Sequence, residues 1–293
     1  MTALIFDKAR LRQLRNAAAA QFNDTDFLIK ATVKSLIDRL SIITPKFKTV
    51  AIYGARINED DLDAIIAALN AETIFVLDVS EHMLARHSKN PQIHLVQSDS
   101  EWLPFANQAL DAVIAVFEHH SLNDLPGALI QARRALRPDG LFMAALPGGD
   151  TLYELREAMT KAEIQIYDGL SPHIFPFADK QQYGALVQRA GFALPVVDSE
   201  YYQVSYTSIY KLFADIKSMG EGNSLTARHK AALMRSFFDL SESLYRQENG
   251  YADDKRFDVT FEIIHIIGWA PHSNQQQPLK PGSADHSLAD ILS

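Results

Sequence analysis

Three titratable side chains follow an apolar run near the middle of the chain, in the order Glu118, His119, His120. A histidine at the carboxyl end of a strand can act as a general base, because the reference pKa of its imidazole is about 6.5. His120 is therefore the candidate catalytic residue; the alternative is a histidine that only hydrogen-bonds a loop. No metal is expected here, because neighbouring strand residues point to opposite faces and no fourth ligand is suitably spaced.

Two carboxylates stand at the ends of two further apolar runs. Asp78 ends the run TIFVLD, and Asp99 follows the run IHLVQ. Ligands of open parallel sheets bind at the carboxyl ends of the strands, so both carboxylates are expected to face one crevice. The simpler alternative for each is that it only caps the helix that follows.

The elements that must position these residues lie between Phe47 and Pro147. Short apolar runs alternate there with amphipathic helices, which is typical of a parallel sheet covered on both faces. The predicted strands are KTVAIYGA, TIFVLDVS, IHLVQSD, ALDAVIAVF and LFMAALP. Before the last strand we expect a helix from Asn123, its N-cap, to Arg137, ended by a turn over residues 137–140. The pattern predicts an α/β, Rossmann-like core.

Four regions are predicted along the chain. Residues 1–43 form an N-terminal helical segment, residues 44–150 the Rossmann-like core, residues 151–270 the rest of the sheet with substrate or lid helices, and residues 271–293 an extended tail. The first helix carries a basic cluster, which we interpret as a solvated helix face; contact with an acidic partner or a lipid surface is the alternative. The cluster consists of Lys8, Arg10, Arg12 and Arg15.

A late apolar strand, VTFEIIHIIGW, precedes a segment with many glycines and prolines. Such residues disfavour helices and central strands, so we expect the segment from Gly268 to Ala284 to recognise a protein partner. In the alternative, Trp269 and Pro271 clamp the tail against the sheet.

Composition narrows the function classes. The 293 residues are 47% hydrophobic and 22% charged, which indicates an ordinary globular protein. The net charge of −8 disfavours nucleic acid as a partner. The absence of cysteine excludes disulfides, thiolate metal ligands and a thiol nucleophile. No run is long enough to span a bilayer and no signal peptide is recognisable, so we expect a cytoplasmic protein.

The order of these motifs resembles class I S-adenosylmethionine-dependent methyltransferases. The resemblance implies a seven-stranded-type sheet with helices on both faces, N-terminal helices and a C-terminal helical insertion. It also implies that Asp78 accepts hydrogen bonds from the ribose of S-adenosylmethionine, and that Asp99 accepts from its adenine, walled by residues 103–105. The implied cofactor-binding residues are Gly54, Arg56, Asp78, Val79, Asp99, Ser100, Glu101 and Phe117.

A closer resemblance, to the respiratory complex I assembly factor 5 family, covers nearly the whole chain. It rests on Phe6-Asp7 and on the stretches NDLPGA, PGGDTL, TFEII, GWAPH and PLKPGSA. It implies a protein partner, a subunit or assembly intermediate of NADH:ubiquinone oxidoreductase, with peripheral proximity to a membrane. Arginine hydroxylation of such a subunit is attributed to this family. Malonyl-carrier-protein O-methyltransferases resemble the chain through the shared core.

The first-strand loop departs from the methyltransferase pattern. Only Gly54 of its glycines is present, although glycines let backbone N–H groups approach the cofactor, and Ile52 replaces the usual acid. Arg56 is one candidate for compensating this loss by pairing with the cofactor's carboxylate, but we favour weakened or lost cofactor affinity. Ser121 also replaces a tryptophan that follows the family histidine, to which His120 corresponds.

Two functions are therefore open. One is an enzyme that transfers a methyl group from S-adenosylmethionine or oxidises a protein arginine. The other is an assembly chaperone that uses the old cofactor cleft as a binding surface. The aromatic residues later in the chain suit an interface, although a core or lid role is the stronger interpretation. They are Tyr201, Tyr202, Tyr206, Phe237, Phe238 and Trp269.

Overall fold

The structure is a computed structural model that describes residues 4–44, 47–87, 91–167, 169–252 and 255–276. Its centre is a seven-stranded sheet in the order β3-β2-β1-β4-β5-β7-β6, in which β7 runs antiparallel to both of its neighbours. The strands are β1 (Thr49–Tyr53), β2 (Thr73–Asp78), β3 (Ile93–Gln97), β4 (Leu110–Val116), β5 (Leu136–Pro147), β6 (Ala193–Tyr206) and β7 (Phe257–Trp269). The predicted α/β class and the five core strands are confirmed.

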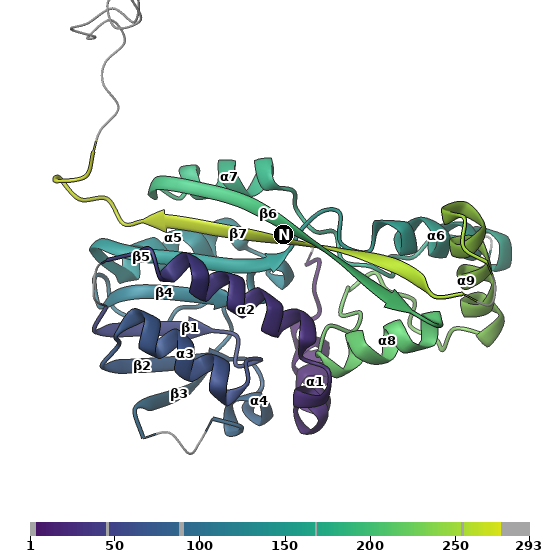
Figure 1. The fold of residues 1–293 in the computed structure, drawn as a ribbon, viewed down its shortest axis with the longest axis horizontal. Helices are drawn as coiled ribbons and strands as arrows, with labels where there is room; N and C mark the ends of the chain where they lie inside the picture. The colour runs from purple at the N-terminus through teal and green to yellow at the C-terminus, as the bar shows by residue number, and fades with distance from the viewer. Residues whose placement is uncertain (1–3, 45–46, 88–90, 168, 253–254, 277–293) are drawn as a thin grey trace, which may run out of the picture.

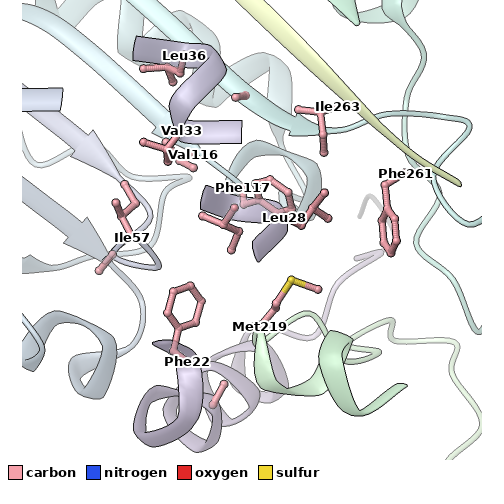
Figure 2. Close-up of a cluster of buried hydrophobic side chains, with 14 of the residues drawn as sticks. Phe22, Leu28, Val33, Leu36, Ile57, Val116, Phe117, Met219, Phe261 and Ile263 are labelled. Atoms are coloured by element: carbon pink, nitrogen blue, oxygen red, sulfur yellow. The ribbon is translucent and has the colours of Figure 1, made fainter. Parts of the chain in front are cut away.

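Helices cover both faces of the sheet (Figure 1). They are α1 (Lys8–Ala18), α2 (Phe27–Leu40), α3 (Glu59–Leu69), α4 (Glu81–Ala85), α5 (Leu125–Ala135), α6 (Tyr153–Tyr167), α7 (Lys180–Arg189), α8 (Ile209–Ser218) and α9 (Arg235–Asn249), with 3₁₀ turns η1 (Ala19–Asp24) and η2 (His119–Ser121). One core joins α2 and α3 to the sheet, and Figure 2 shows part of it, including Leu28, Val33 and Leu36. A second core lies under α5 and α7. No helix in the described ranges is both long and apolar enough to cross a membrane.

The start of α5 differs from the prediction by one residue. Asp124, not Asn123, is the N-cap, and its side chain accepts a hydrogen bond from the backbone N–H of Gly127 at 2.9 Å. The Asn123 side chain instead accepts from the N–H groups of Ile5 and Phe6, both at 2.8 Å. Either residue type can cap a helix, so the sequence alone could not assign the two roles.

The expected turn over residues 137–140 belongs to β5. Asp139 has a positive φ of 60°, and its N–H donates to the carbonyl of Ala270 at 3.1 Å. The N–H of Ala270 donates to the carbonyl of Gly140 at 2.8 Å. Partners about 130 residues away in the sequence thus hold this stretch in the sheet, and no local pattern reveals them.

The first residues of the segment from Gly268 to Ala284 belong to β7, so the expectation that Gly268 disfavours strand pairing is wrong, whereas recognition of a partner by this segment stays a prediction. Gly268 of β7 pairs with Phe142 of the neighbouring β5, and a Cβ on it would lie 3.1 Å from the Cβ of Phe192. This close contact with Phe192 explains why position 268 is a glycine. Trp269 ends β7, and its ring lies 6.4 Å from that of Phe47. The rest of that prediction, from residue 277 onward, lies outside the described residues.

Candidate functional site

The loop after β1 has one position that requires glycine. Gly54 has a φ of 95°, and a Cβ there would lie 2.3 Å from the carbonyl oxygen of Val116. The next residues, Ala55 and Ile57, have buried side chains. The loop therefore packs into the protein, and the backbone N–H of Ala55 donates to Oδ2 of Asp78 at 3.0 Å.

Asp78 ends β2 and is fully buried. Its Oδ1 accepts from the N–H of Ser80 at 2.8 Å, while Oδ2 accepts from Ala55. Ser80, not Asp78, is the N-cap of α4. Asp99 lies two residues beyond β3, the strand that pairs with β2, so the two carboxylates lie at the same edge of the sheet, as predicted.

The first helix supplies a cation to each of these carboxylates. Arg15 of α1 is fully buried, and its Nη1 lies 3.4 Å from Oδ1 of Asp78 and 2.8 Å from Oε2 of Glu118. Burial alone lowers the pKa of Arg15, but the charges of Glu118 and Asp78 outweigh it and raise the pKa. Lys8 Nζ lies 3.1 Å from Oδ1 of Asp99 and 2.8 Å from Oε1 of Glu101.

The interpretation of the basic cluster as a solvated face is therefore wrong for two of its members. Lys8 and Arg15 lie seven residues apart, which places them on the same side of a helix, and this side faces the acids that follow β2 and β3. Arg10 and Arg12 are exposed, as predicted. The acids that Lys8 and Arg15 meet come from other parts of the chain, which helical periodicity cannot show.

Glu118 is the hub of a buried charge network. It accepts a hydrogen bond from Oγ of Ser100 at 2.6 Å and lies 3.7 Å from Nη2 of Arg56. Arg56 also pairs with Glu221 and donates to the carbonyl of Phe117, which has a φ of 52°. Burial raises the pKa of Glu118, but the neighbouring arginines outweigh this and lower it. Arg56 is thus held by protein carboxylates.

His120 lies in η2, and its Nε2 is 2.9 Å from Oε2 of Glu221. Its ring packs between those of Phe117, Phe175 and Phe177. Burial raises the pKa of Glu221, but Arg56 and His120 outweigh burial and hold it well below its usual range. Sequence reasoning missed Glu221, which lies in the interruption GEGNS between two helices. An acid between Gly220 and Gly222 was the one available signal.

Two of the predicted cofactor residues lie at the periphery of this network. The carbonyl of Val79 accepts from the side chain of Gln97 at 3.1 Å. Glu101 accepts from the N–H of Asn123 at 2.5 Å in addition to its contact with Lys8. No group of three His, Asp or Glu side chains suited to a metal occurs among the residues that the structure describes.

The residues at this crevice do not fit S-adenosylmethionine while α1 is docked. Asp78 has no exposed surface, and the buried guanidinium of Arg15 lies against its Oδ1. Asp99 is paired with Lys8. Neither acid lines the large cavity that is bounded by Leu28, Phe117 and Met219. The crevice has the carboxylates that the resemblance implies, and α1 covers them.

The buried His119 leads us to expect a loss of stability in mild acid. Burial lowers its pKa from 6.5 to about 4, so between these pH values the unfolded chain binds a proton at this residue and the folded chain does not. This contribution is intact above pH 6.5 and is lost as the pH falls from 6.5 to about 4. We expect roughly 2 kcal/mol less stability at pH 5 than at pH 7 from this residue, measured by urea unfolding. His119→Leu should reduce this pH dependence, whereas a change at the exposed His82 should not; an unaltered slope in His119→Leu contradicts the assignment.

Comparison with known proteins gives a consistent family. A family described as a methyltransferase domain matches residues 62–144. Arginine-hydroxylase NDUFAF5, mitochondrial, from Homo sapiens is 36% identical over 99% of this chain and 84% of its own length. The Danio rerio protein of the same name is 33% identical over 98% of this chain and 89% of its length. A malonyl-[acyl-carrier protein] O-methyltransferase from Methylovorus is 27% identical over 94% of this chain and 93% of its length.

Solved structures agree on the fold. A putative methyltransferase from Bacillus halodurans has a TM-score of 0.57 at 14% identity, over 81% of this chain and 98% of its own. A Haemonchus contortus phosphoethanolamine N-methyltransferase in complex with S-adenosyl-L-methionine has a TM-score of 0.54 at 13% identity, over 89% of this chain and 60% of its own. The predicted class I methyltransferase fold is thus confirmed. The chain belongs to the NDUFAF5 family and has the class I methyltransferase fold.

Proposed function

We propose that this chain acts on a protein partner in the assembly of a respiratory NADH:ubiquinone oxidoreductase. The observation that carries the proposal is the extent of the family match, which covers 98–99% of the chain, whereas the generic methyltransferase family matches only residues 62–144. The segments outside that range include α1, Glu221 and the β6–β7 pair. The match to the NDUFAF5 relatives includes these segments at 33–36% identity, against 27% for the carrier-protein methyltransferase, so we take them as candidates for the particular function of the family.

Within this proposal, His120 is a positioning residue. Its Nε2 is held by Glu221, and aromatic rings surround its other face, so it orients the Glu221 carboxylate. Three of the predicted cofactor residues, Asp78, Asp99 and Glu101, pair with cations of α1. We place the protein at the periphery of the membrane in which the oxidoreductase is assembled, in line with the mitochondrial relatives.

Complementation tests the proposal. Human cells that lack NDUFAF5 would receive this chain fused to a mitochondrial leader, and assembled complex I would be measured on native gels together with NADH:ubiquinone activity. We expect the chain to restore assembled complex I to a substantial part of its normal level. The control is the Methylovorus carrier-protein methyltransferase fused to the same mitochondrial leader. That protein is 27% identical to this chain. No restoration by a chain that is expressed and folded would contradict the proposal.

S-adenosylmethionine-dependent methyl transfer is a second candidate function. The placement of Asp78 and Asp99 at one edge of the sheet supports it. The docked α1 opposes it in the conformation described, so this function requires that α1 leaves the crevice.

A further inference from the structure

A large cavity lies beside the charge network, and Phe117 and Glu221 belong to its lining. Its volume is about 800 Å³, within the range of pockets that bind small organic molecules. Its walls come from α1, α2, α6, α8, the segment between α8 and α9, and β7. Figure 2 shows four of its apolar wall residues, Leu28, Phe117, Met219 and Phe261, arranged around a common space.

The interior of this cavity is apolar. In addition to those four residues, its wall includes Leu152, Met159, Phe175 and Phe213, which are buried or half-buried. Such a surface favours a ligand with a hydrophobic body, because the ligand and the walls are both removed from water.

The cavity lining carries more cations than carboxylates. Arg10, Lys217 and Lys230 are exposed residues of its lining, whereas Arg228 is already paired with Asp7 at 3.2 Å. Among its described lining residues the one carboxylate is Glu221, which is neutralised by Arg56 and His120. This concentration of cations contrasts with the net charge of −8 of the whole chain. The rim therefore attracts an anion and repels a cation.

We propose that this cavity binds an anionic amphiphile: a single acyl or aryl chain in the apolar interior, with its carboxylate at Arg10, Lys217 and Lys230. A guanidinium guest would meet the three exposed cations and a carboxylate that is already paired. The cavity is accordingly not the place where a positively charged arginine side chain binds. This inference is independent of the assembly role, which concerns a protein partner, and the two are tested by different experiments.

The binding test uses the intact chain and the fluorescent fatty acid cis-parinaric acid. The methyl ester of this acid serves as its uncharged analogue. We expect the acid to bind at least tenfold more tightly than the ester at low salt, with the difference shrinking as salt is added. The variant Arg10→Gln/Lys217→Gln/Lys230→Gln should weaken the acid about tenfold and leave the ester unchanged. The matched control Arg12→Gln/Lys34→Gln/Lys180→Gln removes the same charge from exposed positions outside the cavity lining.

A second variant locates the binding site. Ile216→Trp adds bulk to the cavity wall on α8, so it should weaken the acid and the ester alike. The proposal is overturned if acid and ester bind equally, if neither binds, if the control triple variant weakens the acid as much as the rim variant does, or if Ile216→Trp leaves both unchanged. Displacement of the probe by N-acetylarginine amide at similar concentrations would also overturn it, because that result assigns the cavity to a cation.

Discussion

Replacing Arg15 by alanine is expected to destabilise the protein by about 3–5 kcal/mol, the range found when one partner of a buried ion pair is removed. Arg15 has no exposed surface, and its guanidinium contacts two carboxylates that are themselves buried, Asp78 and Glu118. Without it, Glu118 keeps, among the residues that the structure describes, only the more distant Arg56 as a cationic partner, at 3.7 Å. Alanine also leaves a cavity in place of a large side chain, which adds to the loss.

Urea unfolding of Arg15→Ala and Arg12→Ala measures this effect on one helix. Arg12 is exposed, so its replacement should change the free energy of unfolding by less than about 0.5 kcal/mol. The double variant Arg15→Ala/Glu118→Gln should recover part of the loss, because the neutral amide does not need a cation. Equal effects of the two arginine variants would show that the buried network does not stabilise α1.

Most strands of the sheet can be predicted from the sequence. Strands β1 to β4 are short apolar runs between helices, and such a run by itself indicates a buried strand. The boundary of β5 was not readable, because residues 137–140 look like a turn and are held in the sheet by Ala270. Distant partners also explain why Gly268 is found in a strand. A glycine by itself disfavours a strand, but this one pairs with Phe142 and packs against Phe192. Local patterns identify elements, whereas long-range contacts fix their limits.

In the candidate site, too, local patterns could be predicted and long-range contacts could not. Asp78 and Asp99 could be placed at one edge, because strand order in this fold follows from the alternation of strands and helices. Their partners Arg15 and Lys8 could not be foreseen, since a basic amphipathic helix is normally solvated. Glu221 was hidden for another reason: it lies in a loop, where neither helical nor strand periodicity applies.

The docked α1 implies competition between this helix and S-adenosylmethionine. The resemblance assigns ribose and adenine contacts to Asp78 and Asp99, and α1 places Arg15 and Lys8 on these two acids. Docking is not ideal for the helix, because Nε and Nη2 of Arg15 are buried without hydrogen-bond partners among the described residues. Each unpaired buried donor costs about 1–3 kcal/mol, which narrows the gap between the docked and released states.

We therefore expect weak binding of S-adenosylmethionine to the unaltered chain and tighter binding when α1 is loosened. The apparent dissociation constant is the intrinsic one divided by the released fraction, so every change that favours release raises the affinity. Lys8→Ala removes a partly exposed pair and should tighten binding up to about fivefold, and Arg15→Ala tenfold or more, in calorimetry at low temperature. Arg12→Ala should have no effect.

Reciprocity provides a test that does not depend on the variants. If the cofactor and α1 exclude each other, saturating S-adenosylmethionine must release the helix, and the backbone amides of residues 8–18 should then exchange hydrogen faster. Weaker binding in Arg15→Ala, together with slower exchange in α1 on addition of the cofactor, would show the opposite arrangement. Arg15 would then hold the cofactor's carboxylate, and α1 would be a part of the cofactor site and not its competitor.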